Sequence, residues 1–412
     1  MRFRPFGALP CLLAMQVGAQ APITYQDIQA KARPAPGQWR LDALLAERHL
    51  QLQESRGFLR EGPTLALSAG PRRSPGISTR TDSAFEVDVP LFLSPRLRAV
   101  MEAALGEAHP LLREAARREA SLQLRAAYLE AWLASHTLAL READLATVEQ
   151  WLEAARSRFE AGADPAFQVS LVEGERLKAQ QDLDEARIQR ARAWGSLAAL
   201  AELPSTPVPL ADPGPAPALP GGDLAQRLEQ GPLRRALQAQ AELEARSLRL
   251  KEAQALSRWS LRGSHSREGD ESVTRLGVAI RLPRPGEGAS LRSTTEAQIQ
   301  ALQGETRQAL AELDANIQGL LSRATPASTH EVPPDFAKAA RAVGMRLQEG
   351  RERPSEALPI RRQLLEAQIA FLRRIHARHL LAAELQALLP DPGPEESPSA
   401  PAAPGSPSEV KP

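Results

Sequence analysis

Two histidines and four carboxylates are the residues of this chain whose type and spacing could do chemistry. His376 and His379 lie at positions i and i+3, so they share one helix face. Such a pair could give a metal ion two ligands, but the ion needs at least one or two more. The alternative is two polar residues at a helix seam or lumen wall, and we favour it because the other five histidines are scattered. We therefore predict no metal site.

Catalytic constellations are absent from the sequence. No glycine-rich phosphate loop follows a strand, and no nucleophile elbow occurs. The one cysteine, Cys11, lies near the N-terminus inside an apolar segment. These observations argue against an enzyme, and we expect neither a catalytic residue nor a cofactor.

The carboxylates flank two glycines, Gly162 and Gly350, that each end a long helical stretch. Glycine can take a positive φ and reverse the chain. Asp164-Pro165 and Arg353-Pro354-Ser355 would then restart a helix with capping and first-turn chemistry. Ordinary hairpin turns account for the glycines fully, but their place at the far ends of two hairpins allows partner docking or an opening attractive to cations. The residues assigned to these tips are Glu160, Gly162, Asp164, Glu349, Gly350 and Glu352.

These glycines belong to an internal duplication. Their positions differ by 350 − 162 = 188, and those of the prolines that close the predicted strands, Pro90 and Pro283, differ by 283 − 90 = 193. A nearly constant offset constrains the fold more than a local motif does. Each copy should consist of a strand pair that leads into a long helical hairpin.

The strand pairs are predicted by a change to a period of two. Four strands are expected at residues 63–70, 84–92, 258–264 and 273–283, with Pro71–Ser83 as a solvent loop. One apolar face opposite a polar or small face suits a barrel wall with lipid outside, and a soluble hairpin that rests on helices is the alternative. The residues predicted to face lipid are Phe85, Val87, Val89, Leu91, Leu276, Val278, Ile280 and Leu282.

Long helices favour the barrel over the soluble hairpin. From about Ser94 to Glu160 the sequence has no strong break except Pro110. Roughly 65 helical residues would reach about 100 Å, which is too long for a small globule. Aromatic residues make up only 4% of the chain, as expected of helices packed side by side. The formal net charge is +1 with acids and bases interleaved, so we expect no nucleic-acid partner.

The duplication divides the chain into five parts. Residues 1–19 resemble a secretory signal peptide, with cleavage before Gln20; lipidation of Cys11 is a weaker alternative because Ala8-Leu9-Pro10 is a poor lipobox. Residues 20–202 form the first repeat and 223–389 the second, joined by a proline-rich linker at 203–222. A tail rich in proline and serine follows at 390–412 and is expected to be disordered.

The pattern resembles the TolC-like outer membrane efflux protein family, in particular its heavy-metal and multidrug efflux branch. The motifs that carry the resemblance are the two strand ends, the two tips and a returning helix. They are Val87–Phe92, Val278–Pro283, Arg158–Leu177, Val332–Gly350 and Gln363–Gln368. Each motif is weak alone, but their order and duplication over residues 40–390 make the match fairly specific.

The resemblance implies a mainly α fold with a small β part. Long α-helical hairpins would form a periplasmic α-barrel, and four strands per chain would enter a 12-stranded outer-membrane β-barrel of a homotrimer. The tips would meet a periplasmic adaptor (membrane fusion) protein connected to an inner-membrane pump. The chain would be a passive exit duct of a tripartite efflux or type I secretion-like system in a Gram-negative outer membrane. A periplasmic coiled-coil adaptor or scaffold without a membrane barrel is the alternative.

Overall fold

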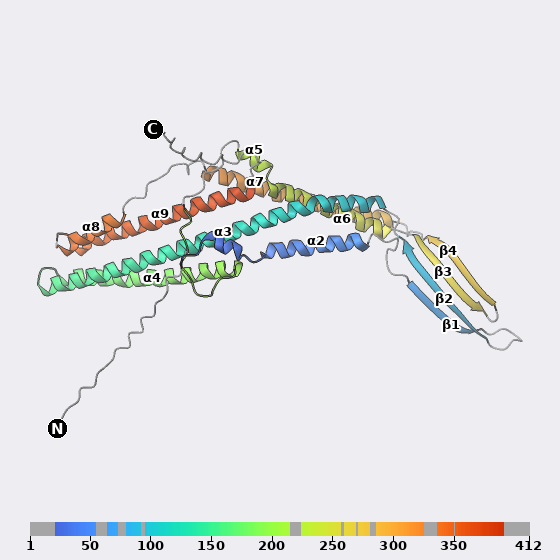
Figure 1. Ribbon diagram of the computed structural model, residues 1–412, viewed down its shortest axis with the longest axis horizontal. Coiled ribbons are helices and arrows are strands. Elements are labelled where there is room, and N and C mark those ends of the chain that lie inside the picture. The colour runs from blue at the N-terminus through green and yellow to red at the C-terminus, as the bar shows by residue number, and fades with distance from the viewer. Residues whose placement is uncertain are drawn as a thin grey trace, which may run out of the picture. The chain divides into compact units, whose positions relative to one another are not determined.

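The computed structural model describes residues 21–54, 64–72, 80–91, 95–214, 224–256, 259–268, 271–280, 286–324, 336–349 and 351–390. The predicted signal peptide, Gly350, Leu282 and all but the first residue of the predicted tail lie outside these ranges. Helices and strands follow one another in the order shown in Figure 1. They are α1 (Tyr25–Ala30), α2 (Pro36–Glu54), β1 (Thr64–Arg72), β2 (Arg80–Leu91), α3 (Pro95–Glu160), α4 (Ala166–Leu200), α5 (Leu224–Glu229), α6 (Pro232–Leu256), β3 (Trp259–Glu268), β4 (Glu271–Ile280), α7 (Glu287–Ala324), α8 (Phe336–Gln348) and α9 (Pro354–Leu388).

The chain forms two compact units that cut across the two sequence repeats. The first unit contains residues 1–33, 124–216 and 333–379, and the second contains 34–123, 217–332 and 380–412. Each unit therefore takes part of both repeats. The repeats at 20–202 and 223–389 are units of sequence, and neither one forms a compact body alone.

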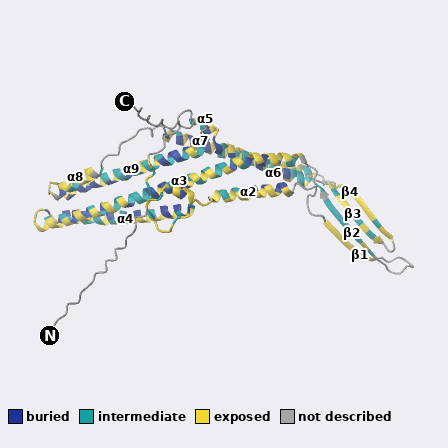
Figure 2. Cartoon of the chain, viewed as in Figure 1, coloured by how far each residue is buried: buried dark blue, intermediate teal, exposed yellow. Residues whose placement is uncertain are grey.

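In the first unit, the α3–α4 hairpin packs against the α8–α9 hairpin. Apolar residues of α3 spaced by three and four lie in this core: Val148, Leu152 and Ala155 are buried, whereas Phe159, four residues further on, is exposed. Trp151 and Leu347 complete the contact between α3 and α8. Figure 2 shows that buried residues recur along these helices between exposed ones, as in helices with one apolar stripe.

In the second unit, two further clusters bury apolar side chains. One lies between α2, α3 and α6 and contains Met101, Leu105 and Leu243. The other gathers leucines from α5, α7 and the end of α9. Arg118 donates to the carbonyl of Leu389, so a side chain of α3 satisfies a backbone acceptor left open at the end of α9.

The four strands form one antiparallel sheet in the order β1-β2-β3-β4. The strands are longer at the loop ends than the sequence predicted: β1 continues to Arg72 and β2 begins at Arg80, both inside the expected loop Pro71–Ser83. Polar and proline residues there extend the ladder because pairing needs only backbone groups that are free to bond across it. The two copies of the strand pair meet at β2 and β3, where Val87 lies opposite Gly263.

The predicted linker is bound to the first unit over its described part, residues 203–214. Trp194 Nε1 donates to the carbonyl of Pro204 at 3.0 Å, and the hydroxyl of Tyr128 donates to that of Ala211 at 2.5 Å. Trp132 Nε1 donates to Asp212 at 2.9 Å. The segment also pairs with the N-terminal segment at Ile23. Donors from buried aromatic rings thus hold a stretch whose composition suggested only a connection.

Among the described residues, none of the helices combines the length and apolar character that a membrane span requires.

Candidate functional site: the sheet face and the hairpin tips

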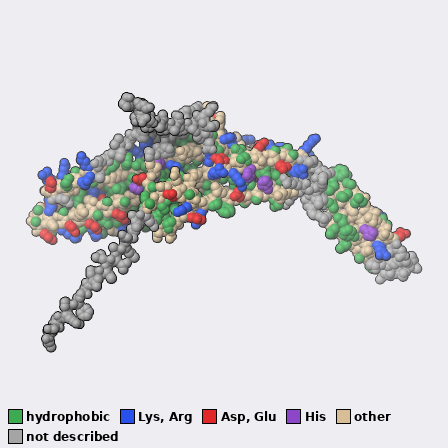
Figure 3. Space-filling model, in the orientation of Figure 1, with side chains coloured by type: hydrophobic (Ala, Val, Ile, Leu, Met, Phe, Trp, Pro, Cys, Tyr) green, Lys and Arg blue, Asp and Glu red, His purple; other side chains and the backbone are tan. Residues whose placement is uncertain are grey.

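The register of the sheet brings the predicted lipid-facing residues onto one face. Val87 lies between Leu65 and Gly263, Leu261 between Val89 and Val278, and the remaining apolar residues follow the same alternation. The described members of this apolar face are Leu65, Leu67, Phe85, Val87, Val89, Leu91, Trp259, Leu261, Leu276, Val278 and Ile280. Figure 3 shows hydrophobic side chains gathered over the sheet. Sequence reasoning left out Leu65, Leu67, Trp259 and Leu261, whose signal was the same alternation of apolar and polar residues.

The opposite face of the sheet is polar. Arg262 lies within 2.9 Å of Glu86 and 3.3 Å of Asp88, and all three side chains belong to this face. A sheet with one exposed apolar face and one ion-paired face separates an apolar medium from water. The large side chains of β1 and β4 are the most exposed: Leu67 is 81% and Leu276 is 78% accessible.

The first tip reverses the chain as predicted, but Asp164 has a different role. Gly162 has a φ of 71°, and α3 ends at Glu160 two residues before it. Pro165 occupies the N-cap position of α4 without a side-chain cap. The buried carboxylate of Asp164 instead lies 2.8 Å from Arg158 Nε. Capping by Asp164 was therefore a wrong prediction, because a buried carboxylate gains more from a guanidinium than from an exposed helix end.

The second tip is closed by an equivalent ion pair. Arg346 Nη1 lies 3.2 Å from Glu352, and Arg351 lies 3.0 Å from Glu349. Pro354 is the first residue of α9, which agrees with the predicted first-turn proline. Gly350 lies outside the described residues. Arginine thus pairs with three of the four tip carboxylates, and the fourth, Glu160, is exposed; a docking role for these residues stays a prediction.

Polar contacts join the two hairpins near their tips. Gln168 Nε2 lies 3.3 Å from Ser355 Oγ, and its Oε1 accepts from the Ser355 backbone N–H at 3.3 Å. That N–H lies in the first turn of α9, where backbone donors have no helical partner. A glutamine from the first repeat therefore completes a helix of the second.

Deeper in the same contact lies a buried ion cluster. Arg361 pairs with both Asp144 and Glu175, in the latter case at 3.0 Å. Arg362 Nε lies 2.9 Å from Glu175. Burial of Arg361, Asp144 and Glu175 makes each charge dependent on its partners. Sequence reasoning missed this cluster because its members are 186 and 217 residues apart.

His376 and His379 both lie on α9 but have different surroundings. His379 is buried and its Nε2 donates to the carbonyl of Gly214 at 3.0 Å, so its partner is the linker segment and not the neighbouring helix that a helix seam would supply. Burial lowers the pKa of His379 below its ordinary value. Burial also lowers the pKa of His376, although the nearby charge of Glu130 acts in the opposite direction. The part of the chain that the structure describes holds no group of three or more metal-ligating side chains.

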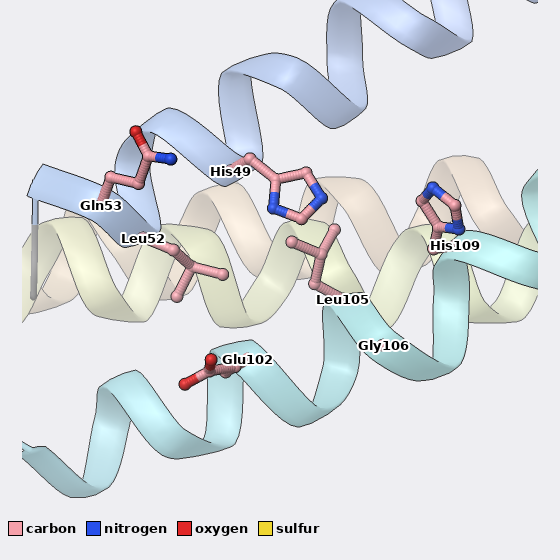
Figure 4. A pocket seen from close by; sticks show the side chains of 7 residues that line it. All are labelled: His49, Leu52, Gln53, Glu102, Leu105, Gly106 and His109. Atoms are coloured by element: carbon pink, nitrogen blue, oxygen red, sulfur yellow. The ribbon is translucent and has the colours of Figure 1, made fainter.

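A pocket of about 370 Å³ between α2 and α3 contains another histidine pair, which the sequence did not reveal. His49 belongs to α2 and His109 to α3, and their ring centroids are 6.5 Å apart (Figure 4). Leu105 lies beside the His49 ring in this view, and Glu102 lies one turn nearer the start of α3. Within the described ranges, this histidine pair belongs to no group of three or more side chains that could hold a metal ion, and we interpret the pocket as a polar groove.

Comparisons with known proteins agree with this arrangement. Residues 60–201 match the family model for outer membrane efflux proteins. A membrane protein from Pseudomonas aeruginosa is similar in structure, with a TM-score of 0.63, 19% identity, and 88% of this chain and 91% of that chain covered. For the outer membrane protein VceC from Vibrio cholerae the TM-score is 0.61 and the identity 18%, with 86% of this chain and 93% of that chain covered. For the open state of the MtrE outer membrane channel of Neisseria gonorrhoeae the TM-score is 0.59 and the identity 19%, with 88% of each chain covered. No curated protein sequence matches the chain.

Proposed function

We propose that this chain, whose residues 60–201 match the family model for outer membrane efflux proteins, is an exit duct of the outer membrane, through which substrates delivered by an inner-membrane pump leave the cell. The observation that carries the proposal is the sheet. Its apolar face is exposed, its other face is ion-paired, and β1 and β4 are edge strands. A lipid environment would complement the apolar face, and only the edges would then lack partners.

Unpaired strand edges lead to the homotrimer. In lipid every backbone N–H and C=O must find a partner within the protein, so an open sheet is not viable there. Closure of β4 of one copy on β1 of the next satisfies both edges, and three copies give 3 × 4 = 12 strands. The helical hairpins would then form the periplasmic part of the duct, and their tips would meet the periplasmic adaptor.

No catalytic step is needed for this function. A duct conducts passively, and the free energy for export comes from the pump. The alternative of a periplasmic adaptor or scaffold without a barrel gives no role to the exposed apolar face formed by both repeats.

Two measurements test the proposal. Cells that express the chain are fractionated into membranes and soluble proteins, and heated and unheated samples are then compared on denaturing gels. We expect the protein in the outer-membrane fraction, with an unheated band of trimer mass that shifts to the monomer on boiling. A monomer released with the soluble periplasmic proteins would refute both the membrane location and the trimer. Deletion of the gene should abolish export by the pump, and a copy of the gene supplied in trans should restore it. This result would show that the pump depends on the duct.

A further inference from the structure

The apolar face of the sheet ends before its strands do. Residues that pair across the sheet form rows, and one row joins Leu67 and Phe85 to His265 and Thr274. The next row toward the strand connections has no large apolar side chain; it consists of Ala69, Ser83, Arg267 and Ser272. Figure 3 shows the same change, from hydrophobic side chains nearer the helices to charged and histidine side chains toward the other end of the sheet. The polar residues on this face form a patch that we call the rim patch: Ser83, His265, Arg267, Ser272 and Thr274.

The boundary of the apolar face crosses the strands at an angle. On β1 and β2 the last apolar row is that of Leu67 and Phe85, whereas on β4 it lies one row earlier, at Leu276. One row is two residues, or about 6.8 Å along a strand, and the step extends over two strand spacings, or about 9.6 Å. A boundary with this slope is level when the strands tilt by about 35° from the membrane normal, within the range of about 35–45° for outer-membrane barrels. The boundary therefore has the inclination that a membrane surface requires.

Charge is distributed unequally over the two faces of the sheet. The register places the carboxylates of Asp82, Glu86, Asp88 and Glu271 on the polar face. Over the described part of the strands, the opposite face carries no acidic residue, and its one arginine or lysine is Arg267. An anion that approaches the rim patch thus meets a guanidinium with no competing carboxylate on that face.

The rim patch has the donors that a phosphate group needs. Arg267 lies directly between Ser83 and Ser272 in its row, and Cβ atoms of such neighbours are about 4.5–5.5 Å apart. A guanidinium can donate two parallel hydrogen bonds to one phosphate, and the two hydroxyls can donate to its other oxygens. His265 Nδ1 lies 2.8 Å from Thr274 Oγ1 in the adjoining row. All five side chains are exposed, so a headgroup can reach them.

We propose that the rim patch binds a phosphate group on the headgroup of an outer-leaflet lipid, whose acyl chains lie on the apolar face beside it. Position selects a lipid over a free phosphate, because the donors of Arg267 directly adjoin exposed Phe85 and Leu276. The inference rests on the proposed function, since only an outer-membrane location turns this end of the sheet toward the outer leaflet.

Titration of the purified trimer with lipid A, a diphosphorylated glycolipid, tests the patch. Native mass spectrometry in a neutral detergent counts the bound lipids and gives their dissociation constant. R267Q should weaken lipid A binding roughly tenfold or more, because it removes a charge-assisted contact with phosphate. The matched control R275Q removes an exposed arginine from the polar face of β4 and should leave the affinity unchanged. R267K keeps the charge without the planar fork and should give an intermediate affinity. Each variant is first checked for the unheated trimer band.

Further ligands and the natural chain separate the outcomes. Lipid A from which both phosphates have been removed should bind the natural trimer as weakly as lipid A binds R267Q, and this result supports the patch. Equal affinity for the two lipids, or an equal loss in R267Q and R275Q, overturns the patch and leaves the duct in place. Inorganic phosphate that binds as tightly as lipid A would overturn the choice of a lipid. Recovery of the natural chain as a soluble monomer overturns both the patch and the duct.

Discussion

In the homotrimer of the proposed function, the hairpins of neighbouring copies would pack as the two hairpins of one chain do, and an added ion pair at the equivalent positions should strengthen that contact. In the chain, Arg362 Nε lies 2.9 Å from Glu175; the equivalent positions, at the offset of 188 residues between the tip glycines, are Gly174 and Gln363, so the double variant is G174R/Q363E. An added Cβ at Gly174 meets no atom within 4 Å, and α4 is helical there, so arginine fits without strain. The two new charges would meet only across the boundary between copies.

The magnitude follows from the in-chain pair. Its arginine side chain is 45% exposed and its glutamate 7%, so the pair lies between a surface bridge and a buried one. We take about 1 kcal/mol per bridge, at the upper end for exposed pairs. Three bridges in a trimer give about 3 kcal/mol, or roughly a 100-fold lower dissociation constant.

The assay heats samples in steps and reads from a gel the temperature at which the trimer dissociates to monomer. This temperature is measured for each member of a double-mutant cycle. Q363E alone should lower this temperature because it places a carboxylate near Glu173 of the next copy. G174R alone, compared with G174A to remove the gain in helix propensity of about 1 kcal/mol, should change it little. G174R/Q363E should raise it above the natural chain, and the stiffer contact should also slow export. Strictly additive effects would refute the reasoning, since they would mean that the two residues do not meet.

Three further predictions address the sheet, the buried cluster and the linker. V278K should abolish outer-membrane insertion, at a cost of about 2–4 kcal/mol per chain, whereas its strand neighbour A279K, on the polar face, should insert; equal insertion of both in the fractionation assay would contradict the lipid-facing assignment. R361A should destabilise the first unit by about 3 kcal/mol in urea unfolding because it leaves buried Asp144 without its partner, and R361A/D144A should recover part of the loss; no recovery would argue against the pairing. Burial holds the pKa of His379 in the folded chain below its ordinary value of 6.5, so the contribution of His379 to stability is complete above that pH and is lost as pH falls through the folded pKa. The urea midpoint of unfolding should therefore drop less between pH 7.5 and pH 5 in H379Q than in the natural chain. An equal drop in both would exclude His379 as the cause.

The duplication made much of this fold predictable. Alternation of apolar residues identified all four strands and, for the second and fourth, the apolar face, because every second residue of a strand points the same way. Gly162 identified a tip since few other residues adopt a positive φ. Local patterns of this kind need no knowledge of distant residues.

Contacts between distant residues were not predictable from one sequence. Asp164 looked like a helix cap because caps are local, but Arg158 binds it once the turn is formed. The linker looked like a spacer because its composition is rich in proline, yet buried donors of α3 and α4 bind its carbonyls and Asp212. The cluster around Arg361 joins three helices, and nothing in the spacing of its members indicates their proximity.

The charge cluster around Arg361 has a physical consequence for a duct that must open. A buried arginine with two carboxylates is costly to separate, because each separated charge would lose its partners while still partly out of water. An apolar contact of a few side chains opens at a lower cost and closes again without a search for specific geometry. The charge cluster lies where two hairpins belong to the same chain and need not separate. The equivalent positions Glu173, Gly174 and Gln363 carry no such cluster.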